Sequence, residues 1–274
     1  MASPVSTGSL RPPTSPRPRR PRLHEQVVRG IVQEVVAGGF TPGAPLPSEA
    51  ELAQRFNVSR AVIREAIRVL VAKGLVLVRH GRGMWLQPPE RWDHLDPLLL
   101  FEQVRSRRDT ALLDELLEVR RLVEVEVAAL AAQRRTAGDL EALGEAVAGM
   151  RQSLHDPDTY THFDNLFHDA ILAAARNRLL RQALEPVFAV LKVGRFISIR
   201  QPGAAEKSMR AHEAIYAAIA QGEVMAARRA MRQHIRESEA DLRAALCSEQ
   251  IWERVTGEMV PGAGVPLAAD GQEC

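Results

Sequence analysis

Residues 42–83 read PGAPLPSEAELAQRFNVSRAVIREAIRVLVAKGLVLVRHGRG, and they carry the strongest structural signals in the chain. Ser48, with Glu51 three residues later, forms a capping box, which predicts that a helix begins at this point. Ser59 is a good N-cap and predicts another helix over 60–73. The stretch therefore predicts two consecutive helices separated by a short break.

One more helix and a hairpin complete this region. Apolar residues recur at helical spacing from Leu23 until Gly38-Gly39, which predicts a helix before the quoted stretch. The runs 75–78 and 84–86 are short and β-prone, and the basic loop between them predicts a hairpin tip. Three helices and a small β-hairpin over 23–88 are the plan of a winged helix-turn-helix DNA-binding domain.

The helix over 60–73 suits DNA recognition, because a helix of this kind presents its first turn to base edges in the major groove. Arg60 and Arg64 lie four residues apart on one face, and Arg68 extends that face. Glycines in the hairpin tip let the backbone approach the sugar-phosphate rail. The alternative for the arginines is an ordinary solvated helix face. The predicted DNA contacts are Ser59, Arg60, Arg64, Arg68, His80, Gly81 and Arg82.

Positive charge is concentrated at the front of the chain. Residues 1–22 carry a net charge of +5 and residues 23–88 carry +3, whereas the remainder carries −6. This asymmetry favours an anionic partner at the front, and a solvated surface with chance asymmetry is the alternative. Residues 1–22 hold six prolines and no apolar periodicity, so we expect a disordered basic arm.

Diagnostic positions across the front region match one known family: Pro42-Gly43, Leu46-Pro47-Ser48-Glu49, Leu52-Ala53, Val58-Ser59-Arg60, Arg64-Glu65-Ala66, Leu70, Gly74-Leu75 and Gly81-Arg82-Gly83. In this pattern the chain resembles the DNA-binding domain of the GntR family. The resemblance implies operator binding by Arg60 and Arg64, with Ser59, His80 and Gly81 nearby. The chain departs from the family at Ala50, where many relatives carry an arginine that contacts DNA.

The rest of the chain is predicted to be helical, so the fold class is mainly α: the winged helix-turn-helix followed by an all-helical bundle. Residues 89–108 are predicted to form a linker and the first helix of the bundle, 109–248 the effector- and metal-binding domain, and 249–274 a loose tail. Helices are expected near 110–135, 139–153, 159–175, 178–198, 204–221 and 223–247, with breaks at Gly138, Asp156-Pro157, Asn177, Pro202-Gly203 and Gly222.

Four polar residues lie on the apolar faces of these rear helices. Asp164 and His168 are four residues apart on one face, and His212 and His234 share faces with apolar residues of two further helices. A buried carboxylate is costly unless it is paired, and a divalent metal would pair it. Aspartate with imidazoles suits Zn, Ni, Mn or Fe, so one such ion per chain is expected. The alternative for each histidine is an ordinary core residue with satisfied hydrogen bonds.

The rear region also resembles a known domain, in Arg120 with Glu124, 128–132, 164–168, Asn177, His212 and 231–234. These positions look like the FCD ligand-binding domain, which defines the FadR-like branch of the GntR family. The resemblance implies a helical bundle that binds a small organic acid beside a metal held by Asp164, His168, His212 and His234. It also implies that Arg120 pairs with the carboxylate of the effector. The alternative for Arg120 is a surface ion pair with Glu124.

Several classes of protein are excluded by composition. The two cysteines argue against a disulfide framework and a cysteine-based zinc site. No apolar run approaches the ~18 residues of a membrane span, and the N-terminus lacks the apolar segment of a secretory signal. The sequence therefore predicts a cytoplasmic protein with no membrane partner.

The combined prediction is a metabolite-responsive transcriptional regulator, most often a repressor in such families. We expect a homodimer that binds a short inverted repeat of double-stranded DNA, because paired heads read paired half-sites. One alternative is a metal-dependent enzyme fused to a DNA-binding head, but no general base is evident beside the predicted metal. Another is a winged helix used for protein contacts, against which the basic recognition helix argues.

Overall fold

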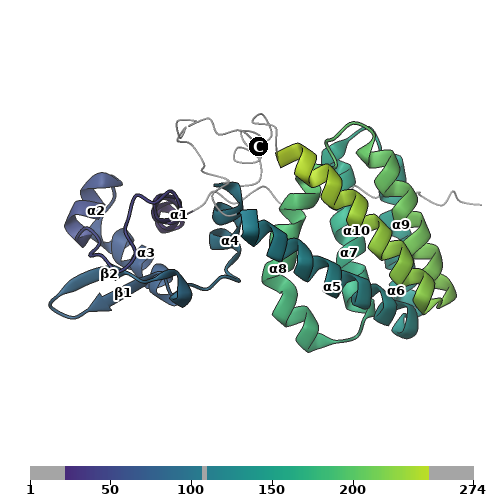
Figure 1. Cartoon of the computed structure of the whole chain (residues 1–274), viewed down its shortest axis with the longest axis horizontal. Coiled ribbons are helices and arrows are strands. Elements are labelled where there is room, and N and C mark those ends of the chain that lie inside the picture. The colour runs from purple at the N-terminus through teal and green to yellow at the C-terminus, as the bar shows by residue number, and fades with distance from the viewer. Residues whose placement is uncertain (1–21, 107–109, 247–274) are drawn as a thin grey trace, which may run out of the picture.

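The computed structural model describes residues 22–106 and 110–246. The predicted basic arm, apart from Arg22, and the predicted tail 249–274 lie outside the described residues. Figure 1 shows a small front unit and a larger helical bundle, with one short helix between them. The predicted order of a winged helix-turn-helix followed by an all-helical bundle is confirmed.

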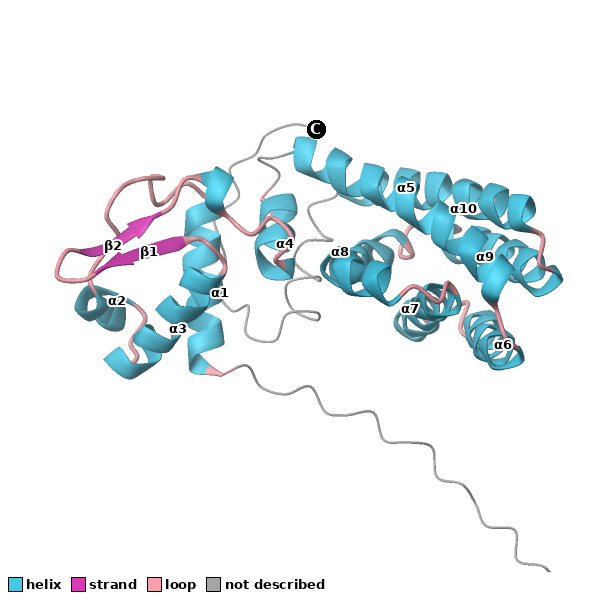
Figure 2. Ribbon diagram, turned by 90° about the horizontal axis from the view of Figure 1, so that it is seen from below, coloured by secondary structure: helices cyan, strands magenta, loops and turns pink. Residues whose placement is uncertain are grey.

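The front unit, here called the head, contains three helices and one hairpin: α1 (Leu23–Val36), α2 (Glu49–Arg55), α3 (Arg60–Ala72), β1 (Val76–Arg79) and β2 (Gly83–Leu86). The strands are antiparallel and pair Val76 with Leu86 at the base and Arg79 with Gly83 at the tip. Figure 2 shows this hairpin at the outer end of the head. Apolar residues of all three helices and both strands share one core, so the hairpin is fixed to the helices.

The two predicted helix starts in the head are confirmed by their hydrogen bonds. Ser48 Oγ accepts from the backbone N–H of Glu51 at 3.3 Å, and Glu51 Oε2 accepts from the backbone N–H of Ser48 at 2.7 Å. Ser59 Oγ accepts from the backbone N–H of Val62 at 3.3 Å. These bonds satisfy backbone donors that the first turn of a helix leaves free, which is why the helices begin there.

Gly74 ends α3 in a conformation that other residues adopt at a cost. Its φ is +70°, and a Cβ at this position would lie 2.2 Å from the backbone oxygen of Arg91. Arg91 belongs to the short 3-10 helix η1 (Pro89–Arg91), which follows the hairpin. The glycine therefore lets the chain turn sharply into β1 while the later segment packs against it.

Helix α4 (Pro97–Arg105) contacts both the head and the bundle. Leu99 is buried in the core of the head, whereas Leu100 packs with residues of α5 and α8 in the bundle. Polar contacts also join α4 to the head. Gln33 Nε2 donates to Glu102 Oε1 at 3.0 Å, and Lys73 pairs with Asp96, the N-cap of α4. The division of the chain at residue 88 stays a prediction, and α4 is shared by the two parts.

The bundle contains six helices within the described residues: α5 (Thr110–Arg134), α6 (Ala137–Gln152), α7 (Pro157–Ala174), α8 (Arg178–Ser198), α9 (Ala204–Gln221) and α10 (Val224–Leu246). Helices α5 and α10 lie side by side, as do α6 and α7 (Figure 2). A large apolar cluster from all six helices forms the core. No helix of the described segments is long and apolar enough to span a membrane.

The predicted helix break at Gly138 is wrong. Helix α6 already begins at Ala137, so Gly138 lies inside it. Thr136 is the N-cap, and Asp139 Oδ2 accepts from the backbone N–H of Thr136 at 2.8 Å. This capping box satisfies the free donors of the first turn and fixes the start of the helix, whereas a single glycine near a helix start only weakens it.

Candidate functional site

The exposed face of α3 carries the three predicted arginines, Arg60, Arg64 and Arg68, and is called the reading face below. The opposite face is buried in the head and consists of Ile63, Ala66, Ile67 and Leu70. This division follows the helical repeat, since residues three and four apart share a face. The first turn of α3, with its N-cap Ser59, is exposed and free to approach a groove of DNA.

Two of the three arginines are held by carboxylates. Arg64 Nε donates to Glu49 Oε2 on α2 at 2.8 Å, and Arg68 Nη1 donates to Glu65 Oε2 at 3.0 Å. Arg60 has no ion pair among the described residues. The sequence suggested no partner for Arg64, because Glu49 lies fifteen residues earlier on another helix.

The hairpin tip presents the predicted wing residues to solvent. His80, Gly81 and Arg82 are all exposed. Gly81 has φ +71°, and a Cβ there would meet nothing within 4 Å, so its backbone is open to close approach. The guanidinium of Arg79 lies 5.1 Å from the centroid of the Trp85 ring, which steadies the strand that leads to the tip.

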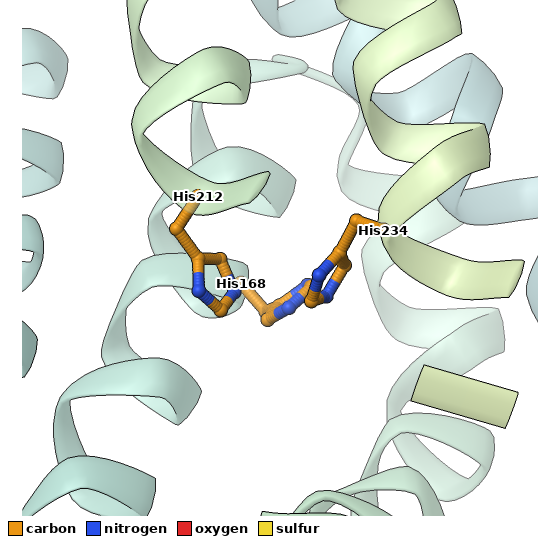
Figure 3. Close-up of side chains that lie close together, drawn as sticks. All are labelled: His168, His212 and His234. Atoms are coloured by element: carbon orange, nitrogen blue, oxygen red, sulfur yellow. The ribbon is translucent and has the colours of Figure 1, made fainter. Parts of the chain in front are cut away.

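The second candidate site lies in the bundle, where four predicted residues converge and form what we call the ligand cluster. Asp164 and His168 come from α7, His212 from α9 and His234 from α10. Figure 3 shows the three imidazoles turned toward one another, and one ring nitrogen of each lies within 4.8 Å of the others. Asp164 Oδ1 lies 3.1 Å from His212 Nε2 and 3.3 Å from His168 Nε2.

The inward atoms of the cluster are buried, and within the described part of the chain their close polar contacts are with one another, with no hydrogen bond to any residue outside the cluster. These atoms are Asp164 Oδ1, His168 Nε2, His212 Nε2 and His234 Nε2. Each unsatisfied buried polar group costs roughly 1–3 kcal/mol, so four together call for a common partner. One carboxylate oxygen and three imidazole nitrogens match the donors that Zn, Ni, Mn or Fe accept, so the residues fit a transition metal.

The pKa shifts of the cluster residues agree with a site that binds a positively charged ion. Burial acts to raise the pKa of Asp164, but His212 and His168 outweigh it and hold that pKa well below its usual range. Burial lowers the pKa of His212 and of His234, which favours the neutral imidazoles that metals bind. Burial also acts to lower the pKa of His168, but the carboxylate of Glu124 raises it.

Polar contacts on the outer side hold two of the imidazoles in place. Glu124 Oε2 lies 2.9 Å from His168 Nδ1. The hydroxyl oxygens of Ser208 and Tyr160 lie 3.3 and 3.4 Å from His212 Nδ1. In both rings the contact uses Nδ1 and leaves Nε2 pointing inward, which is how metal-binding histidines are usually oriented. The sequence had placed Glu124 only in an ion pair with Arg120.

The alternative interpretation of Arg120, a surface ion pair with Glu124, is wrong in its location, and its predicted role as an effector contact stays a prediction. Arg120 Nε does donate to Glu124 Oε1 at 3.2 Å, but both side chains are only 2% exposed. The apolar residues of α5 place this part of the helix inside the bundle, where the pair is shielded from water. Arg120 Nη1 also donates to Ser238 Oγ at 3.0 Å, so most of its guanidinium is already engaged.

Arg195 of α8 is a functional candidate that the sequence did not reveal. It is 2% exposed, and Nη1 and Nη2 have no hydrogen-bond partner among the described residues. Its Nε donates to Asn165 Oδ1 at 2.9 Å, which fixes the direction of the side chain. An arginine in the last turn of an amphipathic helix looks like a surface residue in sequence, so only the packing of α8 reveals that Arg195 is buried.

Arg195 and the ligand cluster border a small cavity, called the effector cavity below. Its wall comprises Asp164, Arg195, Ser198, Ile199, Ala204, Ser208, His234, Glu237, Ser238 and Asp241. The volume is about 10 Å³, which is room for roughly one water molecule. A wider cleft of about 660 Å³, near Arg176 and Arg181, is lined mostly by exposed residues and shares no lining residue with the effector cavity.

Comparisons with known proteins identify both parts of the chain. Residues 23–85 match the family "Bacterial regulatory proteins, gntR family", and residues 115–237 match the FCD domain. The galactonate operon transcriptional repressor of Escherichia coli is 35% identical over 58% of this chain and 69% of that protein. The putative L-lactate dehydrogenase operon regulatory protein of Escherichia coli is 31% identical over 78% of this chain and 84% of its own length.

A solved structure shows a similar fold. The protein is Lar, which controls the expression of the Listeria monocytogenes agr system. The two chains are 20% identical, the match covers 82% of this chain and 99% of Lar, and the TM-score is 0.56. The relatives are regulators of transcription, which counts against the alternative of a metal-dependent enzyme. The chain therefore belongs to the GntR family of bacterial regulatory proteins, in the branch with an FCD domain, and is a transcriptional regulator rather than an enzyme.

Proposed function

We propose that this regulator releases or binds its operator in response to a small 2-hydroxy acid held beside a divalent metal in the bundle. The single observation that carries the proposal is the set of four inward atoms of the ligand cluster, which are buried and make no hydrogen bond to any described residue outside the cluster. We further propose that the protein is a homodimer, acts as a repressor, and binds a short inverted repeat.

The ligand cluster is proposed to hold one divalent ion, Zn, Ni, Mn or Fe, through Asp164, His168, His212 and His234. When bound, the ion supplies positive charge and open coordination positions for a carboxylate. Glu124 orients His168 through Nδ1, and Ser208 and Tyr160 do the same for His212. These contacts support the proposal because they fix the ligands before any ion binds.

The chemical class of the effector follows from the residues around the cavity. Arg195 offers two guanidinium nitrogens that make no hydrogen bond, and only the more distant carboxylate of Glu124, 3.8 Å from Nη1, pairs with them. The two nitrogens match the two oxygens of a carboxylate. Hydroxyl groups of Ser198, Ser208 and Ser238 stand around the same cavity and suit the hydroxyl groups of a polar acid. Two relatives are named for the operons of galactonate and L-lactate dehydrogenase, and both acids carry a hydroxyl beside the carboxylate. Arg120, which the sequence proposed as the partner, would act indirectly through Ser238.

Effector binding and DNA binding are proposed to be linked through α8 and α4. The effector cavity has room for about one water, so a larger ligand must displace the helices around it, including α8 with Arg195. Helix α8 packs on Leu100 of α4, and Glu102 of α4 accepts a hydrogen bond from Gln33 of α1. A ligand that prefers one arrangement of these helices shifts operator affinity, typically by ~1–3 kcal/mol.

The reading face and the wing are proposed to contact the operator. Arg60, Arg64 and Arg68 would enter the major groove with the first turns of α3, while Ser59 approaches a phosphate. His80, Gly81 and Arg82 would follow the sugar-phosphate backbone beside it. The exposure of all these residues supports the proposed contacts.

The proposal is tested by fluorescence anisotropy of labelled promoter DNA from the regulator's own operon. Metal-loaded protein is titrated with D-galactonate or L-lactate, and we expect operator affinity to change by about 5- to 150-fold with at least one 2-hydroxy acid. Arg195→Lys should abolish the response, whereas Arg181→Lys, an exposed arginine of the same helix, should keep it. Ser198→Ala is a milder variant of the cavity. An operator affinity that no such acid changes, with Zn or Ni bound, would overturn the proposal.

A further inference from the structure

Glu49 stands at the first residue of α2, and its carboxylate reaches across to the reading face on α3. Its Oε2 accepts the hydrogen bond from Arg64 Nε at 2.8 Å, and the two side chains are 38% and 62% exposed. This contact joins two different helices, so neighbouring positions on one helix do not account for it. A carboxylate on a surface that meets DNA phosphates also needs a reason, because it repels them.

The position of the contact on the guanidinium is informative. Guanine is read by two parallel N–H groups that donate to its O6 and N7 atoms. Glu49 engages Nε, and Arg64 has no other partner within the described residues, so the two terminal nitrogens stay available. We infer that Glu49 is a positioning residue for base recognition: it fixes the Arg64 guanidinium by Nε so that the terminal Nη pair reads guanine. This inference rests on the DNA contact proposed above for Arg64.

The residue after Glu49 offers no competing partner for the Glu49 carboxylate. Ala50 follows Glu49 and is exposed, and its side chain has no charge to attract the carboxylate away from Arg64. A long arginine stem loses rotamer freedom when it binds a base, and holding it beforehand reduces that loss. Glu49 therefore weakens attraction to phosphates in general and strengthens discrimination at one base pair.

The chain supplies a matched control one turn farther along α3. Glu65 accepts from Arg68 Nη1 at 3.0 Å, and both side chains are exposed, at 48% and 77%. Glu65→Ala and Glu49→Ala each remove one negative charge from the head and release one arginine. Only Glu49→Ala releases the arginine assigned to guanine. Glu49→Gln keeps an oxygen that can accept from Nε but loses the charge.

The experiment uses the full-length protein and a pool of duplexes with a randomised central segment. Bound DNA is selected and sequenced for wild type, Glu49→Ala, Glu49→Gln, Glu65→Ala and Arg64→Ala. We expect wild type to select guanine at one position of each half-site, and Arg64→Ala to lose this preference. Glu49→Ala should weaken the same preference by about tenfold, while its affinity for unselected DNA stays equal or rises. Glu49→Gln should keep most of the preference, and Glu65→Ala all of it.

Three results would overturn the inference: Glu49→Ala selects guanine as wild type does, Glu65→Ala weakens the preference equally, or Glu49→Gln behaves like Glu49→Ala. A different result would show that Arg64 does not contact guanine at all: the Arg64→Ala variant would then keep the guanine preference of wild type. Helical content and melting temperature by circular dichroism show that each variant is folded.

Discussion

The reading face and the ligand cluster both gather charged side chains, but in opposite surroundings. Arg64 and Arg68 are 62% and 77% exposed, whereas His168, His212 and Glu124 are at most 2% exposed. Exposed ion pairs contribute roughly 0–1 kcal/mol to stability, so releasing the arginines of the reading face to bind DNA costs the fold little. A buried charge without its partner costs several kcal/mol. We therefore expect binding at the ligand cluster to be coupled to the stability of the bundle, and DNA binding at the reading face not to be.

The largest expected effect is on the buried side. Glu124→Ala leaves Arg120, Arg195 and His168 without the carboxylate that lies among them. We expect the bundle to lose about 3–5 kcal/mol of unfolding free energy, measured by urea denaturation at neutral pH. The matched control is Glu126→Ala, a change on the same helix as Glu124. It breaks an exposed pair with Arg228 of α10 and should cost about 1 kcal/mol or less of unfolding free energy. Equal losses in the two variants would remove the contrast between buried and exposed charges.

Metal removal is expected to have the next largest effect. A ligand bound at 100 times its dissociation constant stabilises a protein by about 2.7 kcal/mol, so a chelator should lower the melting temperature by roughly 5–10 °C. His212→Ala should lower metal content and effector response together, while operator binding without effector persists. Elemental analysis and differential scanning calorimetry measure both quantities. A melting temperature indifferent to added Zn or Ni, in protein shown to hold no metal, would make the cluster an ordinary polar core.

Arg64→Ala tests the exposed side and should leave stability unchanged. We expect a loss of ~1–3 kcal/mol in operator binding and relaxed preference at one base pair, because one bidentate base contact disappears. Fluorescence anisotropy at fixed salt, with the operator and its single-base variants, checks this. An operator affinity equal to that of wild type would show that Arg64 belongs to the solvated face of α3 and not to the interface.

The smallest expected effect concerns the N-terminal segment. Deleting residues 1–22 should leave the fold intact and weaken DNA binding only slightly, because a proline-rich arm loses conformational entropy whenever its arginines contact phosphates. The salt dependence of operator affinity should become shallower, since up to five arginines are removed. Loss of helical signal in circular dichroism after the deletion would show that this segment supports the fold.

Sequence patterns predicted most of the fold because its signals are local. Capping at Ser48 and Ser59 depends on hydrogen bonds within three residues, and both helix starts are confirmed. The break predicted at Gly138 was wrong because Thr136 and Asp139 form a stronger local signal two residues earlier. Faces of amphipathic helices likewise predicted that His212 and His234 turn inward, and both are buried.

The sequence by itself predicted the candidate residues for DNA and metal binding, which are the reading face on α3, the wing, and four inward residues on three helices. Only the tertiary structure decided which of them meet and what surrounds them. Glu49 pairs with Arg64, Glu124 pairs with His168, and Arg195, whose Nη1 and Nη2 make no hydrogen bond, borders the effector cavity. The physical reason is that helix periodicity gives the face on which a side chain lies, whereas the packing of separate helices sets its neighbours, its burial and therefore its charge.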